Sequence, residues 1–248
     1  MGAEARVLVI IPTYNERAAL PVALSRLRAA EPDVDVLVVD DASPDGTGEV
    51  ADALAATDEA VHVLLRAGKG GLGPAYVAGF GWGLDRGYTT LVEMDADGSH
   101  RPQDLGGLLA RATATDAPDL VIGSRWVPGG AVSNWPKHRE WLSRGANRYT
   151  RVALGLPVKD ATAGFRAYRA DTLRTILAEQ PASAGYCFQI DMAWRVHLAG
   201  GRVEEVPILF VEREQGTSKM SRAIIVEALW RVTGWGLRHR WRQVTRRA

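Results

Sequence analysis

Several features that would define other classes of protein are missing from this sequence. Cys187 is its only cysteine, so no intrachain disulfide can form, which fits a reducing compartment. No apolar run approaches the roughly 20 residues that span a bilayer, and the apolar start at residues 7–11 is too short for a signal peptide. The formal net charge of +1 supplies no general field to attract nucleic acid. We therefore expect a cytoplasmic protein, soluble or peripheral to the membrane, with no nucleic-acid partner.

The first half of the sequence alternates between short apolar runs and segments with helical spacing. The apolar runs, expected to be strands, cover residues 6–11, 34–39, 61–65, 89–94 and 120–122. The segments between them, expected to be helices, cover residues 16–30, 45–56, 74–84 and 102–114. Strands that are apolar on both faces and joined by helices are typical of a parallel sheet covered on both sides. We predict an α/β fold with a Rossmann-like, mostly parallel sheet.

The regular alternation ends after residue 125. The remainder is expected to hold a Gly/Pro-rich loop, two helices, a strand and a closing helix, at residues 126–135, 139–154, 187–198, 203–211 and 221–240, and a short strand after residues 160–166. No segment has the composition of a flexible linker or an internal repeat. We therefore predict a single domain over residues 1–248. Its nucleotide-type half covers about residues 1–125, and its acceptor half covers 126–248 and ends in a basic helix.

Two carboxylates stand close together in Asp95-Ala96-Asp97, directly after a predicted strand. Residues i and i+2 of a strand point the same way, so both carboxylates face one side at the strand's carboxyl end, where open α/β sheets bind ligands. Two adjacent negative charges repel unless a cation lies between them. Mg²⁺ or Mn²⁺ fits this position, because such hard ions prefer carboxylate oxygen and bridge to diphosphates. A solvated acidic turn before the next helix is the alternative.

The first two predicted strands also end in polar side chains. Thr13 and Asn15 follow the first strand, and either could cap the next helix. Asp40 and Asp41 end the second strand together, where a carboxylate removed from water needs a hydrogen-bond donor. An acidic residue at this position can accept hydrogen bonds from a nucleotide base or ribose. These strand ends indicate a nucleotide site at the same edge as Asp95.

Residues 68–73 form a Gly-rich segment, G-K-G-G-L-G, between a predicted strand and a predicted helix. The spacing matches the dinucleotide fingerprint, and Asp95 stands roughly 20 residues further on, as that fingerprint requires. Asp95, however, already belongs to the carboxylate pair, and Lys69 inside the loop suits a diphosphate near a helix N-terminus. We therefore rank diphosphate binding above dinucleotide binding. A flexible connection is the simplest alternative for the glycines.

The second half of the chain supplies cationic side chains near the ends of predicted elements. Arg125 follows a strand, and Arg213 and Lys219 lie beyond the last strand. Arg139 and Arg144 belong to the helix that follows the Gly/Pro-rich loop. Any one of them alone fits a solvated surface charge, but together with a metal pair they suit two phosphate-bearing substrates. One substrate would carry a nucleoside diphosphate and the other a phosphate monoester.

Eight segments of the chain together resemble one family of enzymes. They read IPTYNE, VVDDASPDGT, GKGGLGPAYVAG, EMDADGSHRP, DLVIGSRWVPGG, TAGFRAY, GYCFQID and VPILFVEREQGTSKM. The combination is similar to the inverting GT-A glycosyltransferases, and within them to the dolichol- and polyprenol-phosphate mannose synthases. The Trp-, Ala- and Arg-rich sequence most resembles the actinobacterial members. The resemblance runs from about residue 7 to about residue 235. It implies GDP-mannose as donor and a polyprenyl phosphate as acceptor.

The resemblance also implies roles for individual residues. It implies that Asp95 and Asp97 hold Mg²⁺ or Mn²⁺, and that Ser99 completes the site directly or through water. It implies donor contacts for Pro12, Tyr14, Glu16, Val39, Asp41, Asp95, Ala96, Asp97 and Gln189, which Lys69 joins from its place in the Gly-rich loop. It implies phosphate contacts for Arg125, Arg213 and Lys219. We add Arg139 and Arg144, noted above, as candidate phosphate or acceptor contacts. Asp191 is a candidate general base, or a residue that orients basic side chains.

A phosphate acceptor determines the mechanism that we expect. The acceptor is already an anion near neutral pH, so its oxygen needs little help from a general base. The protein must hold two anions in line at the anomeric carbon and screen their repulsion with cations. The metal would stabilise the departing GDP. Direct displacement would invert the α linkage of the donor and give β-mannosyl phosphoryl polyprenol.

Three other interpretations of the sequence stay open. The nearest is the same transfer with another nucleotide sugar, such as glucosyl transfer to polyprenyl phosphate. A sugar-1-phosphate nucleotidyltransferase would need a Gly-rich phosphate loop after the first strand, where this chain has Pro12-Thr13-Tyr14-Asn15-Glu16. A non-catalytic binding protein is the third, and the doubled carboxylate argues against it.

The last segment of the chain combines indole rings with basic side chains. They are Trp230, Trp235, Leu237 and Trp241, with Arg231, Arg238, Arg240, Arg242, Arg246 and Arg247. Such a composition favours attachment to the cytoplasmic face of a membrane, at about 1 kcal/mol per basic residue near an anionic surface. The alternatives are an amphipathic helix packed on the domain, or anchoring by a separate membrane-protein partner.

Overall fold

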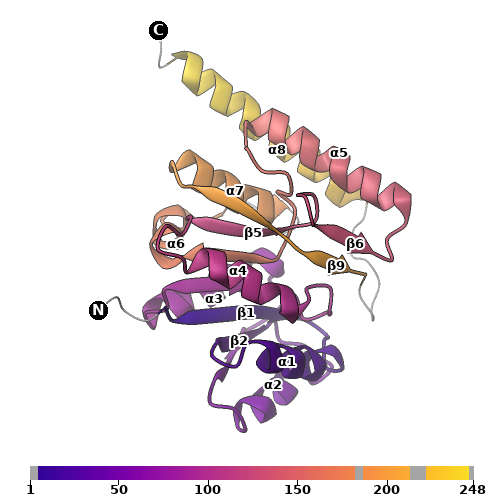
Figure 1. Ribbon diagram of the computed structural model, residues 1–248, viewed down its shortest axis with the longest axis vertical. Helices are drawn as coiled ribbons and strands as arrows, with labels where there is room; N and C mark the ends of the chain where they lie inside the picture. Colours follow the sequence, from indigo (N-terminus) through magenta and orange to yellow (C-terminus); the bar gives the residue numbers. More distant parts are fainter. Residues whose placement is uncertain (1–4, 182–186, 213–221, 246–248) are drawn as a thin grey trace.

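A computed structural model describes residues 5–181, 187–212 and 222–245 of the chain. Its centre is a seven-stranded sheet in the order β3-β2-β1-β4-β7-β5-β8 (Figure 1). These strands are Val7–Thr13 (β1), Asp35–Asp40 (β2), Val61–Leu65 (β3), Thr90–Glu93 (β4), Leu120–Ser124 (β5), Arg166–Arg169 (β7) and Val203–Pro207 (β8). All pairs are parallel except those of β7, which runs antiparallel to both β4 and β5. The predicted α/β fold with a mostly parallel sheet is confirmed.

Helices cover both faces of this sheet. One face packs against α1 (Ala19–Ala30), α2 (Thr47–Ala55) and α4 (Leu105–Ala112), which follows a short 3-10 turn at Pro102–Asp104. The other face packs against α3 (Leu72–Asp85), α6 (Ala170–Ile176) and α7 (Cys187–Leu198). Outside this second layer lie α5 (Lys137–Leu154) and α8 (Arg222–Thr245), which run side by side (Figure 1).

The two faces of the strands build two separate cores. In β1, Val9 and Ile11 pack with Leu24 of α1, while Leu8 and Ile10 pack with Phe80 of α3, and all six are buried. Alternate residues of a strand point to opposite faces, so a strand buried on both sides must be apolar throughout. This is why the apolar runs of the sequence correctly predict the first five strands.

The segment predicted as one strand at residues 203–211 is two strands in two sheets. β8 ends at Pro207, and β9 (Leu209–Val211) pairs instead with β6 (Ala131–Ser133) in a separate two-stranded sheet. Proline has no amide hydrogen to donate to a ladder, so a continuous strand is interrupted there. The prediction of a single strand is therefore wrong, as is that of an uninterrupted loop over residues 126–135, and α6 was not predicted.

α8 crosses α5 at very short range. A Cβ atom placed on Gly236 would lie 2.4 Å from the carbonyl oxygen of Ala153, so only glycine allows this approach. The Tyr149 and Thr233 hydroxyls share a 2.5 Å hydrogen bond across the same contact, and Trp235 stacks on Trp194 of α7. Of the helices in the described part of the chain, none is both long and apolar enough to cross a membrane.

Candidate active site

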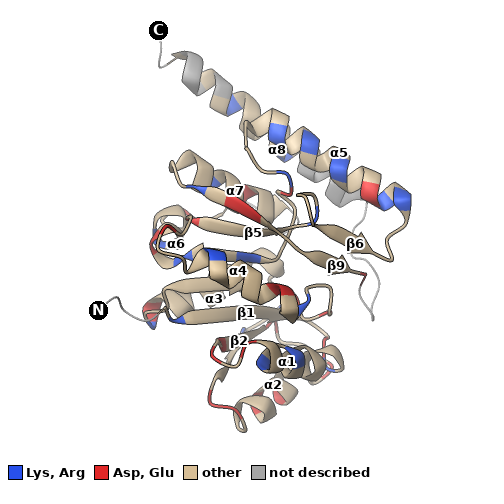
Figure 2. Cartoon of the chain, viewed as in Figure 1, with Lys and Arg blue, Asp and Glu red and all other residues tan. Residues whose placement is uncertain are grey.

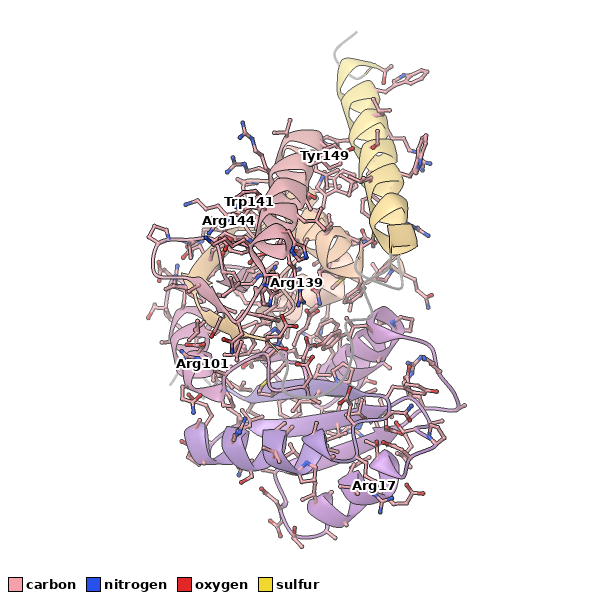
Figure 3. The ribbon with its side chains drawn as sticks, turned by 90° about the vertical axis from the view of Figure 1, so that its right-hand side faces the viewer. Arg17, Arg101, Arg139, Trp141, Arg144 and Tyr149 are labelled. Carbon is pink, nitrogen blue, oxygen red and sulfur yellow. The ribbon has the colours of Figure 1, made fainter. Side chains whose placement is uncertain are left out.

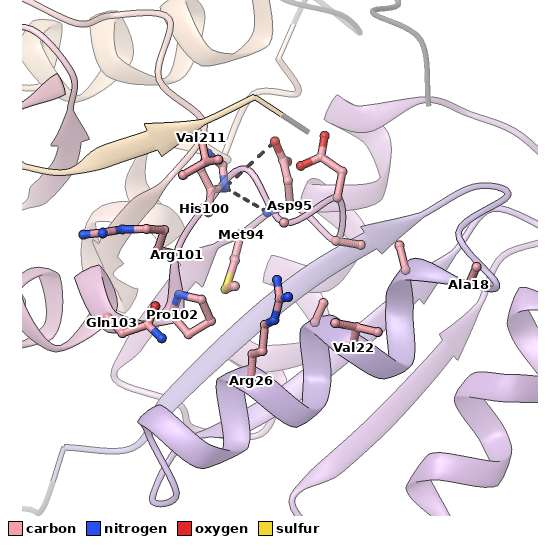
Figure 4. Close-up of a pocket in the computed structure, with 15 residues that line it drawn as sticks. Ala18, Val22, Arg26, Met94, Asp95, His100, Arg101, Pro102, Gln103 and Val211 are labelled. Atoms are coloured by element: carbon pink, nitrogen blue, oxygen red, sulfur yellow. Dashed lines mark hydrogen bonds and ion pairs between the residues drawn. The ribbon is translucent and has the colours of Figure 1, made fainter. Parts of the chain in front are cut away.

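A large cleft opens where the carboxyl ends of the parallel strands meet the second half of the chain. Its volume is about 470 Å³. It is lined by residues at the carboxyl ends of β1, β2, β4 and β5 and by residues of α5 and α8. A second cavity of about 230 Å³ lies between residues 94–103 and α1 (Figure 4). The segment Asp95-Ala96-Asp97 lines both cavities, so it forms the thin wall between them.

Asp95 and Asp97 both line the large cleft, although they lie in the loop after β4, which ends at Glu93, so strand alternation does not place them there. The Tyr76 hydroxyl of α3 lies 3.4 Å from Asp95 Oδ1. Burial, followed by the negative charge of Asp95, raises the pKa of this phenol well above its usual value, so Tyr76 stays a donor. The backbone amide of Ser99 donates to Asp97 Oδ1 at 3.0 Å. Ser99 is itself buried and lines neither cavity, so its predicted metal contact stays a prediction.

Most of the predicted donor contacts gather at one end of the cleft. Pro12, Tyr14, Glu16, Asp41 and Lys69 all line it. The Lys69 ammonium lies 3.9 Å above the centre of the Tyr14 ring, which joins the Gly-rich loop to the end of β1. Ala96 and Gln189 also line the cleft, whereas Val39 is fully buried in the core behind it.

The two aspartates at the end of β2 both find donors. Asp40 accepts hydrogen bonds from the hydroxyls of Thr13 and Ser43, at 2.8 and 2.6 Å. Asp41 accepts from the backbone amides of Gly70 and Gly71, each at 2.9 Å, and pairs with Arg66. Asp41 thus fixes the Gly-rich loop that presents Lys69, a task that the sequence analysis did not assign to it.

Arg125 is buried at the end of β5 and is already paired. Its guanidinium forms two hydrogen bonds to Asp160, at 2.7 and 2.6 Å, and a third to Thr162 at 2.9 Å. Burial alone would raise the pKa of Asp160, but the Arg125 charge and its hydrogen bonds outweigh burial, and the pKa lies below its ordinary value. Arg125 therefore lines the cleft as half of a neutral pair, with Asn147 bonded to the same carboxylate.

Two arginines of α5 pack on tryptophan rings of the preceding loop. Arg139 and Trp135 line the cleft, whereas Arg144 and Trp126 do not. Arg144 lies 4.1 Å from the ring centre of Trp126, and Arg139 lies 4.0 Å from that of Trp135. Arg139 also pairs with Glu212, and Arg144 with Glu140. Figure 3 shows both arginines on α5 with Tyr149, and Figure 2 shows the basic residues along that helix.

Of the other predicted residues, Asp191 lies away from the cleft, and two fall outside the described part of the chain. Asp191 is buried in α7, accepts a 2.9 Å hydrogen bond from Arg195 one turn later, and does not line the cleft. Its predicted role as a base or an orienting residue therefore stays a prediction without a contact to the cleft. Arg213 and Lys219 lie outside the described residues.

A buried carboxyl group lies beneath Asp95. Glu93 is fully buried in β4, opposite Arg166 of β7, and no donor in the described residues meets its oxygens in good geometry. Burial raises the pKa of Glu93 to about 8, against the opposing effects of Arg166, Gln189 and Tyr168. Glu93 is therefore uncharged at neutral pH.

This burial makes a testable prediction about stability and pH. The native state keeps the Glu93 proton up to about pH 8, whereas the unfolded chain releases it near its ordinary pKa of about 4.3. The native state thus binds more protons between these values, so the free energy of unfolding should fall as pH rises, by up to about 1.4 kcal/mol per pH unit. Glu93→Gln should flatten this slope in urea titrations from about pH 5 to pH 9. Parallel profiles for the two proteins would contradict the assignment.

Several residues of the site could not be recognised from sequence. Tyr76 lies within hydrogen-bond distance of Asp95, and Asp160 bonds Arg125 and Asn147, so these residues support the cleft from behind through contacts between separate segments. His100 lies in the predicted acidic turn and was passed over. Its only signal was its position three residues after Asp97.

The fold and the carboxylate edge define a glycosyltransferase. The family model described as "Glycosyl transferase family 2" matches residues 8–177, and the chain belongs to that family. The predicted GT-A fold is confirmed by solved structures. The glucosyl-3-phosphoglycerate synthase from Mycobacterium tuberculosis aligns with a TM-score of 0.66 at 17% identity, over 95% of this chain and 80% of that chain. Neither the nucleotidyltransferase nor the dinucleotide-binding alternative agrees with this family.

Two curated relatives are much more similar in sequence. The undecaprenyl-phosphate mannosyltransferase of Micrococcus luteus is 60% identical over 236 residues, which is 95% of this chain and 96% of the relative. The polyprenol monophosphomannose synthase of Mycolicibacterium smegmatis is 57% identical over 237 residues, covering 95% and 88% of the two chains. The resemblance to polyprenol-phosphate mannose synthases is confirmed by these matches.

Proposed function

We propose that this enzyme transfers mannose from GDP-mannose to a polyprenyl phosphate with inversion at the anomeric carbon. The two curated relatives support the mannosyl donor sugar and the polyprenyl acceptor by their names. The mannosyltransferase of Pyrobaculum calidifontis, solved with GDP-mannose and Mn²⁺, shares the fold with a TM-score of 0.56 at 19% identity, over 88% of this chain and 59% of that chain.

The observation that carries the proposal is the composition of the cleft from end to end. One end holds Asp95, Asp97 and Lys69, which suit a diphosphate. The other end passes between α5 and α8 and is lined by apolar side chains, namely Leu142, Ala146, Tyr149, Leu229 and Val232. A lipid phosphate needs both, because its headgroup requires charge and its first isoprene units require an apolar surface.

Asp95 and Asp97 fit a divalent cation such as Mg²⁺ or Mn²⁺. Both residues line the cleft, and no cluster of three or more His, Cys, Asp or Glu side chains able to hold a metal occurs in the described ranges. An ion there would complete its coordination with diphosphate oxygens and water, as Mg²⁺ commonly does. When bound, it would supply positive charge to the diphosphate leaving group.

The remaining chemistry is performed by side chains of the chain itself. The acceptor phosphate needs no strong base, so the main task is to hold two anions in line. Arg139 stands over Trp135 at the junction of the polar and apolar ends of the cleft, where it suits the acceptor phosphate. Tyr76 donates to Asp95 and fixes the carboxylate at the donor end.

The donor and acceptor can be tested together. The protein is incubated with polyprenyl phosphate and either GDP-[³H]mannose or UDP-[³H]glucose, and label is followed into the organic phase. We expect label from GDP-mannose only, in a product whose sugar linkage is β by NMR. Transfer from UDP-glucose instead would support the glucosyl alternative, and no transfer from either would refute the proposed acceptor.

We also propose that α5 and α8 bring the enzyme to the lipid surface. Trp230, Leu237 and Trp241 lie on one stripe of α8, and the two indoles are 76% and 72% exposed. Trp141 of α5 is 73% exposed. Exposed indoles beside basic side chains favour the headgroup region. Arg246 and Arg247 lie outside the described residues, as do the side chains of Arg240 and Arg242.

Removing both exposed indoles of α8 should weaken this attachment. In co-sedimentation with anionic liposomes, Trp230→Ala/Trp241→Ala should bind at least about tenfold more weakly than wild type. A tenfold change corresponds to about 1.4 kcal/mol, and burying an aromatic side chain contributes more binding free energy than that. Leu65→Ala is the matched control, because Leu65 is exposed on β3 at the far edge of the sheet. Equal, salt-insensitive binding by all three proteins would exclude the helix as the attachment surface.

A further inference from the structure

His100 is a buried imidazole directly behind the carboxylate edge. Only 2% of its surface is exposed. Its ring stacks on Phe165, with centroids 4.9 Å apart and an interplanar angle of 13°, and meets the edge of Phe210 at 5.6 Å. A ring held on both sides in this way has one orientation, so its nitrogen atoms are fixed in direction.

One of those nitrogen atoms holds the main chain of Asp95. The backbone amide of Asp95 donates to His100 Nδ1 at 3.0 Å (Figure 4). A nitrogen that accepts a hydrogen bond carries no proton, so the imidazole is neutral with its proton on Nε2. The 3.9 Å approach of Nδ1 to Asp95 Oδ2 is therefore not an ion pair. The contact that matters is the one to the backbone.

The rest of the segment is fixed at separate points. Gly98 adopts φ +77°, a left-handed turn that glycine favours. The Ser99 amide donates to Asp97, and the Ser99 carbonyl accepts from Val211 of β9 at 3.2 Å. The Met94 amide still donates to Ile10 of β1, at 3.1 Å, and the Asp95 amide, one residue further on, donates to His100.

We propose that His100 is a positioning residue that holds Asp95 at the metal–diphosphate edge by accepting its backbone amide. His100 lines both cavities beside Asp95, but this role acts through the Asp95 backbone and requires no contact between the imidazole and a substrate. It determines where the Asp95 carboxylate stands relative to Asp97, and so the affinity of the pair for a divalent cation. This inference rests on the metal site of the proposed function.

Two substitutions separate the hydrogen bond from the ring stack. His100→Phe keeps an aromatic ring between Phe165 and Phe210 but removes the acceptor, whereas His100→Asn places a carbonyl oxygen near the position of Nδ1 but removes the ring. Phe165→Leu is the matched control, because it disturbs the same stack and leaves the acceptor in place. Mn²⁺ binding in the presence of GDP is measured by the EPR signal of free Mn²⁺, beside the melting temperature of each variant.

We expect His100→Phe to weaken Mn²⁺ binding at least about tenfold, the change that 1.4 kcal/mol produces. His100→Asn and Phe165→Leu should bind Mn²⁺ nearly as wild type does, although both melt at lower temperature. A merely structural role would instead make binding follow melting temperature across the three variants. Wild-type binding by His100→Phe, or equal losses in His100→Phe and His100→Asn, would overturn the proposal.

Hydrogen exchange provides a readout that needs no variant. The Asp95 amide of the wild-type protein should exchange slowly, and an unprotected amide would overturn the proposal even if His100→Phe did not fold. Failure of the wild-type protein to bind Mn²⁺ with GDP would refute the proposed metal site together with this role. Binding by wild type that is unchanged in His100→Phe would refute the role of His100 alone.

Discussion

Asp97→Asn should lower the rate of sugar transfer by at least a factor of about a hundred to a thousand, the range seen when a charge-stabilising group is removed from an active site. The carboxamide loses the negative charge that a divalent cation requires. It keeps an oxygen that can accept the Ser99 amide, so the turn after Asp97 is retained. Steady-state rates with saturating donor and acceptor, at several Mn²⁺ and Mg²⁺ concentrations, measure the effect.

The same substitution should leave the fold nearly unchanged. Asp97 is half-buried at the wall between two cavities and belongs to no core cluster. The melting temperature of Asp97→Asn should therefore stay close to that of wild type. The melting temperature of Asp97→Ala should fall somewhat further, because alanine has no side-chain oxygen to accept the Ser99 amide. Normal turnover of Asp97→Ala in the presence of EDTA would exclude the metal mechanism.

Arg125→Ala should reduce both activity and stability. The substitution leaves Asp160 ionised and buried without its cation, and breaking a buried pair in this way costs about 3–5 kcal/mol. If Arg125 also screens a substrate phosphate, the transfer rate of the folded fraction should fall about a hundredfold. Urea denaturation and rates measured on the same samples record both effects. Lys159→Ala, an exposed charge outside the cleft, is the control.

A double variant separates these two effects. Arg125→Met/Asp160→Asn removes both charges and keeps an amide that can still bond Thr162 and Asn147, so most of the lost stability should return. Its activity should stay low if Arg125 contributes charge to the reaction. Full activity in this double variant would restrict Arg125 to a structural role, and an unchanged stability of Arg125→Ala would contradict the buried pair.

The sequence allows the first half of the fold to be predicted because local rules are sufficient there. Strands buried on both faces are apolar throughout, and helices joining parallel strands follow in chain order. β7 and β9 are different, because the sequence predicts a short strand after residue 166 and a single strand over residues 203–211 but indicates neither the partners of β7 nor the break at Pro207. Their positions depend on partners far away in the sequence, such as β4 for β7 and β6 for β9.

The candidate site divides in the same way. Asp95, Asp97 and Lys69 were predicted to line it because each follows directly from a strand end or a helix start. The partners of the predicted residues were not predictable, because a charge in a sequence carries no sign of what neutralises it. Arg125, predicted to contact phosphate, bonds Asp160, and Asp41, predicted to contact the donor, bonds the Gly-rich loop; both also line the cleft.

The place of β7 has a consequence for how this chain can be assembled and recombined. β4 ends at Glu93 and β5 begins at Leu120. The strand that lies between them in the sheet, β7, comes much later in the chain and ends at Arg169. Such a long loop must close before β4 and β5 share a sheet, which raises contact order and slows folding. A ribosome that has released residues 1–125 therefore holds a nascent chain with an open β4 edge, prone to mispairing. Exchange of a donor-binding half between homologous genes would succeed only if β7 were inherited with it.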